Sequence, residues 1–595
     1  MQSKWNLKPL YNADTDPKIA KDRKRLHLEA YKFINKWKNR ADYLQNPKTL
    51  KLALDEYEDW ARNFGSSGSE GYYLSLRTAQ DEIYPKLKAL ENKLNDFSTK
   101  IANDIQFFEL KIAKIDPKLQ SKFLKSPELK EYKHFFERLF SQSKHLLTEP
   151  EEKILNLKSQ TAYSNWIKMT SSFITKEERI VLDEKLKKSK KNFSELMSLL
   201  SSTNKKVRDK AAKAVNEIFE KHSDVAENEL NSILQDHKIN DELRKFSRPD
   251  SARILSDDME SDTVDALLTA VTNKFDTAKR FYKLKAKLLK TNKLKYHERN
   301  VPIGKITKKY TFNESIKIIN EAFIKLDPEF SQILQIFVKN GQIDVFPQKG
   351  KTGGAFCAHN TIPQPTYILL NHDDKFNDVL TFAHELGHGI NNELIKKKQN
   401  ELNFGTPLST AEVASTFMED FVIQELMQNV DNETRLAIIM NKLNDDISTI
   451  YRQIACYNFE KDLHTEFRKK GYLPKEEIGR LFTKHMSTYM GDYVEQSKGS
   501  QNWWIYWSHI RRFFYVYSYS SGLLISKSLQ NSVKKDVKFI KEVKEFLSAG
   551  LSDSPKNIFA KLGIDITDKK FWLKGLKEVD ELLNEAENLA KILKV

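Results

Sequence analysis

The sequence predicts a mainly α protein with two lobes and one small β-sheet. Apolar residues recur three and four positions apart over most of the 595 residues, which is the period of an amphipathic helix. The chain contains only 19 glycines and 16 prolines, so long helices are rarely interrupted. A chain of this length is too long for one simple hydrophobic core, and we therefore expect at least two lobes.

The N-terminal part is predicted to be a helical lobe. From residue 16 to about 204 the helical period continues, as in Y-P-K-L-K-A-L-E-N-K-L-N-D-F at 84–97. A second helical stretch follows L-S-S-T-N-K-K near residue 200. We therefore place an N-terminal helical lobe at 1–200 and a second domain at 201–595.

A short region before Asp378 is predicted to form the sheet. Between about 340 and 375 the chain includes I-D-V-F-P-Q-K-G-K-T-G-G-A-F-C-A-H-N-T-I-P-Q-P-T-Y-I-L-L-N-H, where β-branched and aromatic runs are separated by glycine and proline. Such runs favour short strands over helix. The helical period returns at Asp378 and continues, with interruptions, to the end of the chain. We therefore expect a small sheet directly before a long helix.

Composition and charge exclude several classes of protein. The net charge is +16, but basic and acidic residues are interspersed and no zinc-finger, RNP or P-loop pattern is present, so we expect no specific nucleic-acid partner. The N-terminus has no apolar signal region, and no stretch approaches 18 consecutive apolar residues, which predicts no membrane span. Two cysteines, Cys357 and Cys456, are too few for a disulfide framework. These observations predict a cytoplasmic protein.

The segment T-F-A-H-E-L-G-H-G-I at 381–390 contains the strongest chemical motif. On an α-helix, residues four apart point the same way, so His384 and His388 can bind a single ion. Glu385 lies on a neighbouring part of that face, where it can reach a water on the ion but is poorly placed to be a ligand. This is the H-E-x-x-H arrangement of zinc hydrolases. The alternative is a pair of core or surface histidines that happen to lie four apart.

A zinc hydrolase needs a third protein ligand, and the next predicted helix offers two carboxylates. In S-T-A-E-V-A-S-T-F-M-E-D-F at 409–421, Glu412 and Glu419 are seven residues apart and share one helical face. Glu412 fits a ligand, but the run from Ser409 to Glu412 also matches a capping box, and spacing alone does not choose between these roles. Glu419 would then accept a hydrogen bond from a ligand histidine and fix its tautomer. The alternative for Glu419 is an ordinary surface carboxylate.

Several ordered segments together resemble a known family. The chain contains, in this order, G-G-A-F-C, P-T-Y-I-L-L-N, D-V-L-T-F-A-H-E-L-G-H-G, T-P-L-S-T-A-E-V-A-S-T-F-M-E and H-I-R-R-F-F-Y-V-Y-S-Y-S-S-G. In order and spacing they closely resemble the signature segments of the oligoendopeptidase F branch of the thimet oligopeptidase family. The resemblance spans roughly 350 to 525 and implies a two-lobed helical metallopeptidase with a deep central channel, which admits oligopeptides and excludes folded proteins. The resemblance therefore implies that residues 201–595 form the catalytic domain.

Carried over position by position, the resemblance implies a set of site residues. The ligands of one zinc ion per chain fall on His384, His388 and Glu412, and the catalytic glutamate falls on Glu385. The residues that contact substrate near the end of the channel fall on His509 and on three tyrosines, namely Tyr515, Tyr517 and Tyr519. The stretch that is commonly H-F-Y in this branch is H-I-R in this chain, so contacts there are expected to differ.

The resemblance also implies a mechanism. Zinc lowers the pKa of its bound water from about 15.7 towards about 7, and Glu385 takes the proton of this water and later delivers it to the departing amine. We predict that the hydroxyl of Tyr517 stabilises the oxygen that gains negative charge, with His509 as a second donor. The alternative for the tyrosines is packing in a buried strand or helix.

The glycines near the motif are predicted to give space to other backbones. Gly387 and Gly389 would let a neighbouring backbone pass close to the metal helix, and Gly353 and Gly354 would keep a strand free of side chains where an extended peptide lies. A peptide that pairs with a strand edge is held by its main chain, so we expect broad specificity. Three functions remain open: an endopeptidase for short peptides, a related peptidyl-carboxypeptidase, and a non-catalytic basic helical binding protein.

Overall fold

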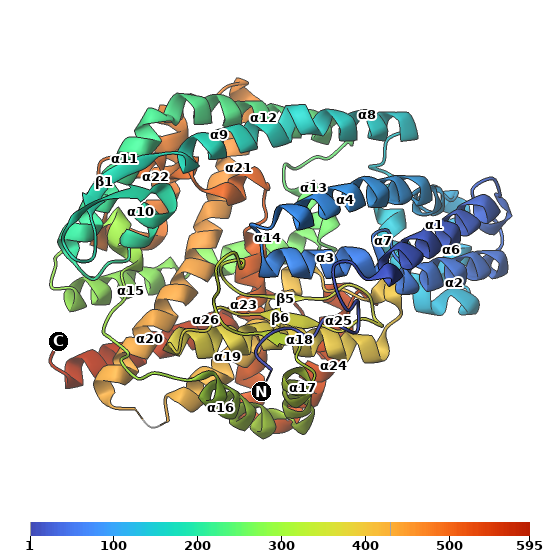
Figure 1. The fold of residues 1–595 in the computed structure, drawn as a ribbon. Helices are drawn as coiled ribbons and strands as arrows, with labels where there is room; N and C mark the ends of the chain where they lie inside the picture. The colour runs from blue at the N-terminus through green and yellow to red at the C-terminus, as the bar shows by residue number, and fades with distance from the viewer. Residues whose placement is uncertain (1, 429) are drawn as a thin grey trace. The chain divides into compact units, whose positions relative to one another are not determined.

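The computed structural model describes residues 2–428 and 430–595 and is mainly α-helical, as the sequence predicts (Figure 1). Two compact units divide the chain, and each consists of three segments. Unit 1 comprises Met1–Lys144, Thr307–Gln428 and Ser532–Ile564. Unit 2 comprises His145–Ile306, Asn429–Asn531 and Asp565–Val595. The boundary expected near residue 200 lies inside unit 2, so the division into domains at 1–200 and 201–595 stays a prediction.

Unit 1 contains the N-terminal helices, the helix that carries the H-E-x-x-H motif and the helices around it. They are α1 (Pro17–Trp37), α2 (Pro47–Asn63), α3 (Gly68–Gln80), α4 (Pro85–Ile105), α5 (Phe107–Ala113), α6 (Pro117–Leu124), α7 (Lys133–Ser143), α16 (Phe312–Leu326), α17 (Pro328–Lys339), α18 (Phe376–Lys398), α19 (Val413–Leu426), α24 (Ile540–Leu547) and α25 (Pro555–Lys561). Several begin with proline at the first helical position, which suits the helical φ and sacrifices no hydrogen bond.

Unit 2 is built from the remaining helices. They are α8 (Glu149–Ser159), α9 (Asn165–Thr175), α10 (Phe193–Leu199), α11 (Lys205–Lys221), α12 (Ser223–Leu243), α13 (Ser251–Ser256), α14 (Ser261–Thr272), α15 (Phe275–Leu288), α20 (Asn432–Asp446), α21 (Arg452–Lys470), α22 (Lys475–Met490) and α26 (Lys569–Ile592), together with the start of α23 (Tyr517–Lys535). In the described part of the chain, no helix is both long enough and apolar enough to span a lipid bilayer.

The sheet predicted between 340 and 375 is present in unit 1. It contains β4 (Ile343–Asp344), β5 (Phe356–Ala358) and β6 (Tyr367–Leu369) in the order β4-β6-β5. β4 is parallel to β6, whereas β5 is antiparallel to it, with Cys357 opposite Ile368. β5 is therefore an edge strand among the described residues, and one row of its backbone groups faces away from the sheet.

The sequence analysis missed a hairpin in a region that it assigned to helix. β1 (Glu178–Leu182) and β2 (Lys188–Asn192) pair antiparallel in unit 2. E-R-I-V-L is rich in β-branched residues, and the Asp183 side chain accepts the backbone N–H of Lys185 and Lys187, each at 2.9 Å. These local preferences outweigh the helical period of the surrounding sequence. A further pair of short strands, β3 (Leu294–Lys295) and β7 (Val494–Glu495), is parallel.

The metal helix α18 lies against α19 on one side and against the sheet and α17 on the other (Figure 1). A Cβ at Gly387 would lie 2.6 Å from the Cα of Ser415 on α19, so only glycine permits this approach, and the prediction for Gly387 is confirmed. The prediction for Gly389 is wrong, because the atoms closest to it do not belong to a neighbouring backbone. A Cβ there would meet the ring of Phe337 on α17 at 3.1 Å, which is a side chain and not a neighbouring backbone.

The N-terminal segment packs against the β4-β6-β5 sheet of unit 1. The indole N–H of Trp5 donates to the carbonyl of Ile368 at 2.8 Å, and the backbone N–H of Asn6 donates to the carbonyl of Gly341 at 2.7 Å. Trp5, Tyr367 and Leu369 belong to one buried cluster. The strands next to the metal helix are therefore anchored by residues more than 300 positions away in the sequence.

Candidate active site

α18 places His384 and His388 on one face, as the spacing of four predicts. Their ring centroids are 5.1 Å apart, and about a quarter of each side chain is exposed. The helix begins where the carboxylate of Asp378 accepts the backbone N–H of Lys375 at 2.9 Å. The two imidazoles are therefore accessible, and they project from a helix that is fixed at its start and closely packed along its length.

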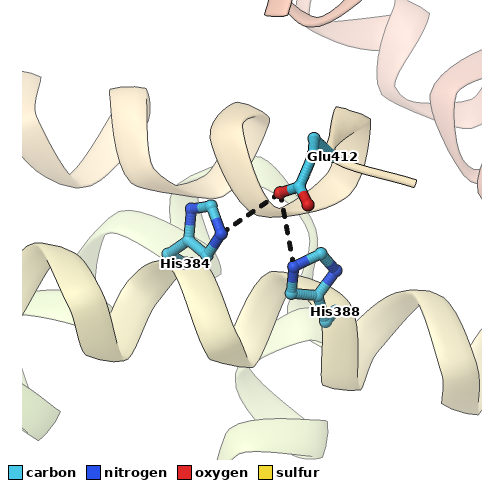
Figure 2. Close-up of side chains that lie close together, drawn as sticks. All are labelled: His384, His388 and Glu412. Atoms are coloured by element: carbon cyan, nitrogen blue, oxygen red, sulfur yellow. Dashed lines mark ion pairs between the residues drawn. The ribbon is translucent and has the colours of Figure 1, made fainter. Parts of the chain in front are cut away.

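Glu412 joins the two histidines from the start of α19. Its Oε2 lies 3.3 Å from Nε2 of His384 and 3.5 Å from Nε2 of His388, and both contacts are drawn in Figure 2. Burial raises the pKa of Glu412, but hydrogen bonds with the two histidines outweigh burial and hold the pKa well below its usual range. The hydroxyl of Ser415 donates to the same carboxylate oxygen at 3.0 Å. The carboxylate is thus ionised and directed at the histidines.

The capping box considered for Glu412 does not form. Ser409 lies in a short 3₁₀ segment, Leu408–Thr410, and α19 begins only at Val413, with Glu412 as its N-cap. Glu412 has φ −88° and ψ 1°, and no side-chain hydrogen bond caps the helix. The extra 3₁₀ turn moves the helix start by several residues, which frees the Glu412 side chain for the histidines.

The three side chains fit the geometry of a zinc site. Their candidate ligand atoms all lie within 4.8 Å of one another. Tetrahedral ligands about 2.0–2.1 Å from zinc are separated from each other by roughly 3.3–3.4 Å. The separations of 3.3 and 3.5 Å between Glu412 and the histidines match this value. Two histidines and one glutamate also form the donor set of a catalytic zinc site, which keeps its fourth position open.

Glu419 lies two turns further along α19 and contacts the other nitrogen of His384. Its Oε2 is 3.2 Å from Nδ1, and only 19% of its side chain is exposed, which does not fit an ordinary surface carboxylate. Burial by itself lowers the pKa of His384, but Glu412 and Glu419 outweigh burial and raise the pKa to about 10. The two carboxylates therefore create a negative environment that favours a cation at Nε2.

Glu385 occupies a separate position from the three convergent groups. It is 7% exposed, and burial raises its pKa above the ordinary value, although His384 and His388 lower it in part. The backbone N–H of Cys357 on β5 also favours its ionised form. Its carboxylate therefore lies near the edge strand β5.

Gly353 and Gly354 precede that edge strand and leave open space beside it. An added Cβ at either glycine would have no heavy atom within 4 Å, so no described side chain fills the space. Gly354 has φ +76°, a conformation that residues other than glycine rarely adopt. Both features leave room for the extended chain that the sequence analysis predicts here.

The sequence analysis missed a polar pair on the same face of α18. Asn392, one turn beyond His388, lies 3.0 Å from Nδ1 of His359, which follows β5. Burial, with help from Lys396 and His388, lowers the pKa of His359 to about 4, so the ring is neutral. The spacing of four from His388 to Asn392 could have indicated this residue, whereas nothing in the sequence indicates its contact with His359.

His509 and two of the predicted tyrosines lie together in unit 2. Nε2 of His509 is 3.0 Å from the hydroxyl of Tyr519, and the rings of His509 and Tyr515 are stacked with centroids 6.0 Å apart. Burial lowers the pKa of His509, and the charge of Arg452 lowers it further. The approach of this group to the ligand set of unit 1 stays a prediction.

The choice of Tyr517 as the donor needs correction. Its side chain is fully buried, and its hydroxyl donates to Oδ2 of Asp257 at 2.8 Å. Tyr517 is the first residue of α23, so it projects from a different face of that helix than Tyr519, whereas Tyr515 lies before the helix. A hydroxyl inside the core and bonded to a buried carboxylate is not available to a substrate. The packing alternative therefore describes Tyr517.

Comparisons with known proteins support the resemblance that the motifs indicate. The model of peptidase family M3 matches residues 198–578, and a second model, described as oligopeptidase F, matches residues 111–173. Oligopeptidase PepF of Bacillus subtilis is 25% identical over 600 residues, which covers 98% of this chain and 87% of the relative. Group B oligopeptidase PepB of Streptococcus agalactiae is 24% identical over 524 residues, covering 87% and 86%.

A solved structure shows the same fold. The crystal structure of oligoendopeptidase-F from Enterococcus faecium superposes with a TM-score of 0.71 at 20% sequence identity, covering 96% of this chain and 99% of that one. The first family model alone covers more than half of the chain. The chain therefore belongs to peptidase family M3, and within it to the oligoendopeptidase F branch that the motifs around residues 350–525 indicate.

Proposed function

We propose that this peptidase is a zinc-dependent oligoendopeptidase that hydrolyses internal bonds of short, unfolded peptides in the cytoplasm. The observation that carries the proposal is the convergence of His384, His388 and Glu412, in which both glutamate–histidine separations match those of a tetrahedral zinc site. A zinc ion held by these residues would polarise the peptide carbonyl and lower the pKa of a coordinated water to about 7.

Glu385 supplies the proton transfer in this proposal. Its carboxylate accepts a proton from the attacking water and delivers it to the nitrogen of the leaving amine. A general base works best when its pKa approaches the working pH, and burial moves the pKa of Glu385 in that direction. The backbone N–H of Cys357 lies close enough to favour the ionised carboxylate, so the base sits near the edge strand.

The edge strand β5 would position the substrate. An extended peptide can add to its free side through main-chain hydrogen bonds, and the space beside Gly353 and Gly354 leaves room for that chain. Main-chain pairing selects extended peptides and reads little of their sequence. A folded protein offers no free strand of this kind, which supports a preference for oligopeptides.

The oxyanion donor is assigned to Tyr519, supported by His509, in place of Tyr517. With its proton on Nε2, the ring of His509 donates to the Tyr519 hydroxyl, whose own proton can then be donated to the substrate oxygen. Tyr515 lies against both rings and is proposed to contact substrate. In this scheme Tyr517 only anchors the start of α23 through Asp257.

The proposal is tested with a fluorogenic peptide blocked at both ends. Wild-type protein should cut it internally, Glu385→Gln should bind zinc but lose nearly all activity, and His388→Ala should lose the metal, measured by elemental analysis. Cleavage of a doubly blocked peptide also excludes an obligatory peptidyl-carboxypeptidase. Full activity of Glu385→Gln, or about one equivalent of zinc retained by His388→Ala, would refute the assignment of roles.

A further inference from the structure

Unit 2 contains a cavity of about 640 Å³, and among its described lining residues only His509 has a role in the proposed chemistry. His509 forms part of its wall, together with Trp503 and Trp507, and α9 forms another part. Ile167 and Ile174 add apolar surface. The cavity has the size of a small-ligand site, since such sites typically measure 300–1,000 Å³. It is also connected to the predicted substrate contacts through His509.

The charged groups around this cavity do not balance. Three arginines and one glutamate line it, and the carboxylate of Glu229 is fully occupied by Arg511, with contacts of 2.8 and 2.9 Å. Arg299 and Arg452 form no ion pair with any residue that the structure describes. Two positive charges are therefore left over at one cavity. Arg299 is buried and Arg452 is half-buried, and a charge removed from water without a partner is unfavourable, so the cavity favours an anion.

Further hydrogen-bonding groups at the cavity also lack partners. Nε of Arg299, Nε of Arg452 and Nε1 of Trp507 are buried and find no acceptor in the described part of the chain. Arg299 is 6% exposed, and its guanidinium is held over the rings of Tyr296 and Trp503 at 4.2 and 4.8 Å. Aromatic stacking fixes the plane of that guanidinium, and its Nη1 donates to the carbonyl of Tyr296 at 2.8 Å, while its Nε is left for a ligand. These donors and charges suit a carboxylate.

We propose that this cavity binds a carboxylate of the peptide substrate through Arg299 and Arg452, next to His509. The inference rests on the proposed function, because that function makes peptides the ligands of this protein. Peptides offer two sources of this group, the C-terminal carboxylate and an acidic side chain. Either source gains charge-assisted hydrogen bonds that an amide or a neutral side chain does not provide.

The test compares three N-terminally blocked peptides of one sequence. The first has a free C-terminal carboxylate and no acidic residue, the second is amidated, and the third is amidated with one glutamate. For wild-type protein we expect KM to be about 10-fold or more lower for at least one carboxylate peptide than for the neutral peptide. The favoured peptide identifies the source, and a C-terminal source also predicts cleavage at a fixed distance from the C-terminus.

Arg452→Met and Arg299→Met should each remove this preference, so that KM becomes nearly equal for the carboxylate peptides and the neutral peptide. Arg280→Met is the matched control, because Arg280 belongs to the same unit but pairs with Glu587 at 2.9 Å, away from the cavity. It should retain the preference. Thermal melting monitors the folding of each variant. If one arginine variant does not fold, the other variant and the comparison of the three peptides with wild-type protein still test the inference.

A second measurement separates this inference from the proposed function. Calorimetric titration of Glu385→Gln with the same peptides reports binding without hydrolysis. If no peptide is ever cut but the carboxylate peptide still binds about 10-fold more tightly, the cavity assignment stands and the proposed function fails. Equal KM and equal affinity for all three peptides, or a preference that survives in both arginine variants, would overturn the inference.

Discussion

Glu419 is placed to orient the ring of His384 without being one of the three convergent groups. Its carboxylate contacts Nδ1 of His384 and leaves Nε2 of the same ring directed at Glu412. A carboxylate in this position fixes the tautomer and increases the basicity of the coordinating nitrogen. The position of Glu419 on α19, seven residues after Glu412, makes one helix responsible for both contacts.

We predict that Glu419→Gln weakens zinc binding by about 10- to 100-fold, because the amide cannot accept as strong a hydrogen bond from the imidazole. Competition with a zinc chelator at fixed pH measures the change. Glu425→Gln is the control, since Glu425 is also on α19 but pairs with Lys325 at 2.6 Å. Equal zinc affinity of Glu419→Gln and wild type would contradict the role of Glu419 in orienting His384.

Substitutions of Tyr517 and Tyr519 should have different effects, one on stability and the other on catalysis. Tyr519→Phe should lower kcat by about 10²- to 10³-fold with KM nearly unchanged, because an oxyanion donor acts mainly in the transition state. Tyr517→Phe should keep kcat but lose about 1–3 kcal/mol of stability, because Asp257 loses a buried hydrogen bond. Steady-state kinetics and thermal melting distinguish the two. A large kcat loss in Tyr517→Phe with unchanged stability would reverse our assignment.

At the scale of elements, the close contact between α18 and α19 depends on a glycine, Gly387, which has no side chain. Gly387 brings the backbone of α19 close enough for Glu412 to reach both histidines. An added methyl group has no space there, because the nearest atoms belong to the rigid backbone of Ser415 and Ala414.

Gly387→Ala should therefore destabilise the protein by about 1–3 kcal/mol and also weaken zinc binding, since the two helices must separate. Gly353→Ala is the matched control, because a Cβ at residue 353 meets no atom within 4 Å and the backbone there has no positive φ. Thermal melting with and without chelator measures both effects. Wild-type zinc affinity in Gly387→Ala would show that the helices tolerate separation.

The elements that sequence predicted best are those with strong local signals. The metal helix follows from its period and motif, and the sheet follows from its glycines, prolines and β-branched runs. Glu412 had two possible roles in the sequence because a capping box and a ligand share the same spacing. Only the 3₁₀ turn at Leu408–Thr410, which moves the start of α19, separates the two roles.

Other features depend on contacts between distant segments, which local patterns do not encode. Tyr517 meets Asp257 across 260 residues, so the alternation of tyrosines gave no information about which hydroxyl is buried. The pairing of Asn392 with His359, and the unpaired arginines of unit 2, arise in the same way. The β1–β2 hairpin differs, because its β-branched run and Asp183 turn are local signals that the surrounding helical period obscured.

At the scale of the whole molecule, Glu460 makes stability depend on pH. It is fully buried on α21, and its Oε1 accepts the backbone N–H of Phe514 at 3.0 Å. Burial raises the pKa of Glu460 from 4.5 to about 8. Between these values the folded protein holds a proton that the unfolded chain has released, so stability falls as pH rises from about 4.5 to 8.

Glu460→Gln should remove this loss, because glutamine keeps an oxygen acceptor for Phe514 but never ionises. The difference in unfolding free energy between pH 5 and pH 8.5 should shrink by about 2–4 kcal/mol relative to wild type. Glu466→Gln on the same helix is the control, because Glu466 is a surface partner of Lys470. Identical pH profiles of wild type and Glu460→Gln would show that the pKa of Glu460 is the same in the folded and the unfolded protein.

The bond from Trp5 to Ile368 spans 363 residues, and this distance affects how the protein folds. Contacts between remote segments form slowly, because a long loop must close before they contribute stability. The helices of the chain have local hydrogen bonds and can form much earlier. Refolding from denaturant should therefore restore the far-ultraviolet helical signal well before zinc uptake, and the assembly of the metal centre should report the final stage of folding. Simultaneous recovery of the helical signal and of zinc uptake would indicate that the β4-β6-β5 sheet and its contact with Trp5 form early.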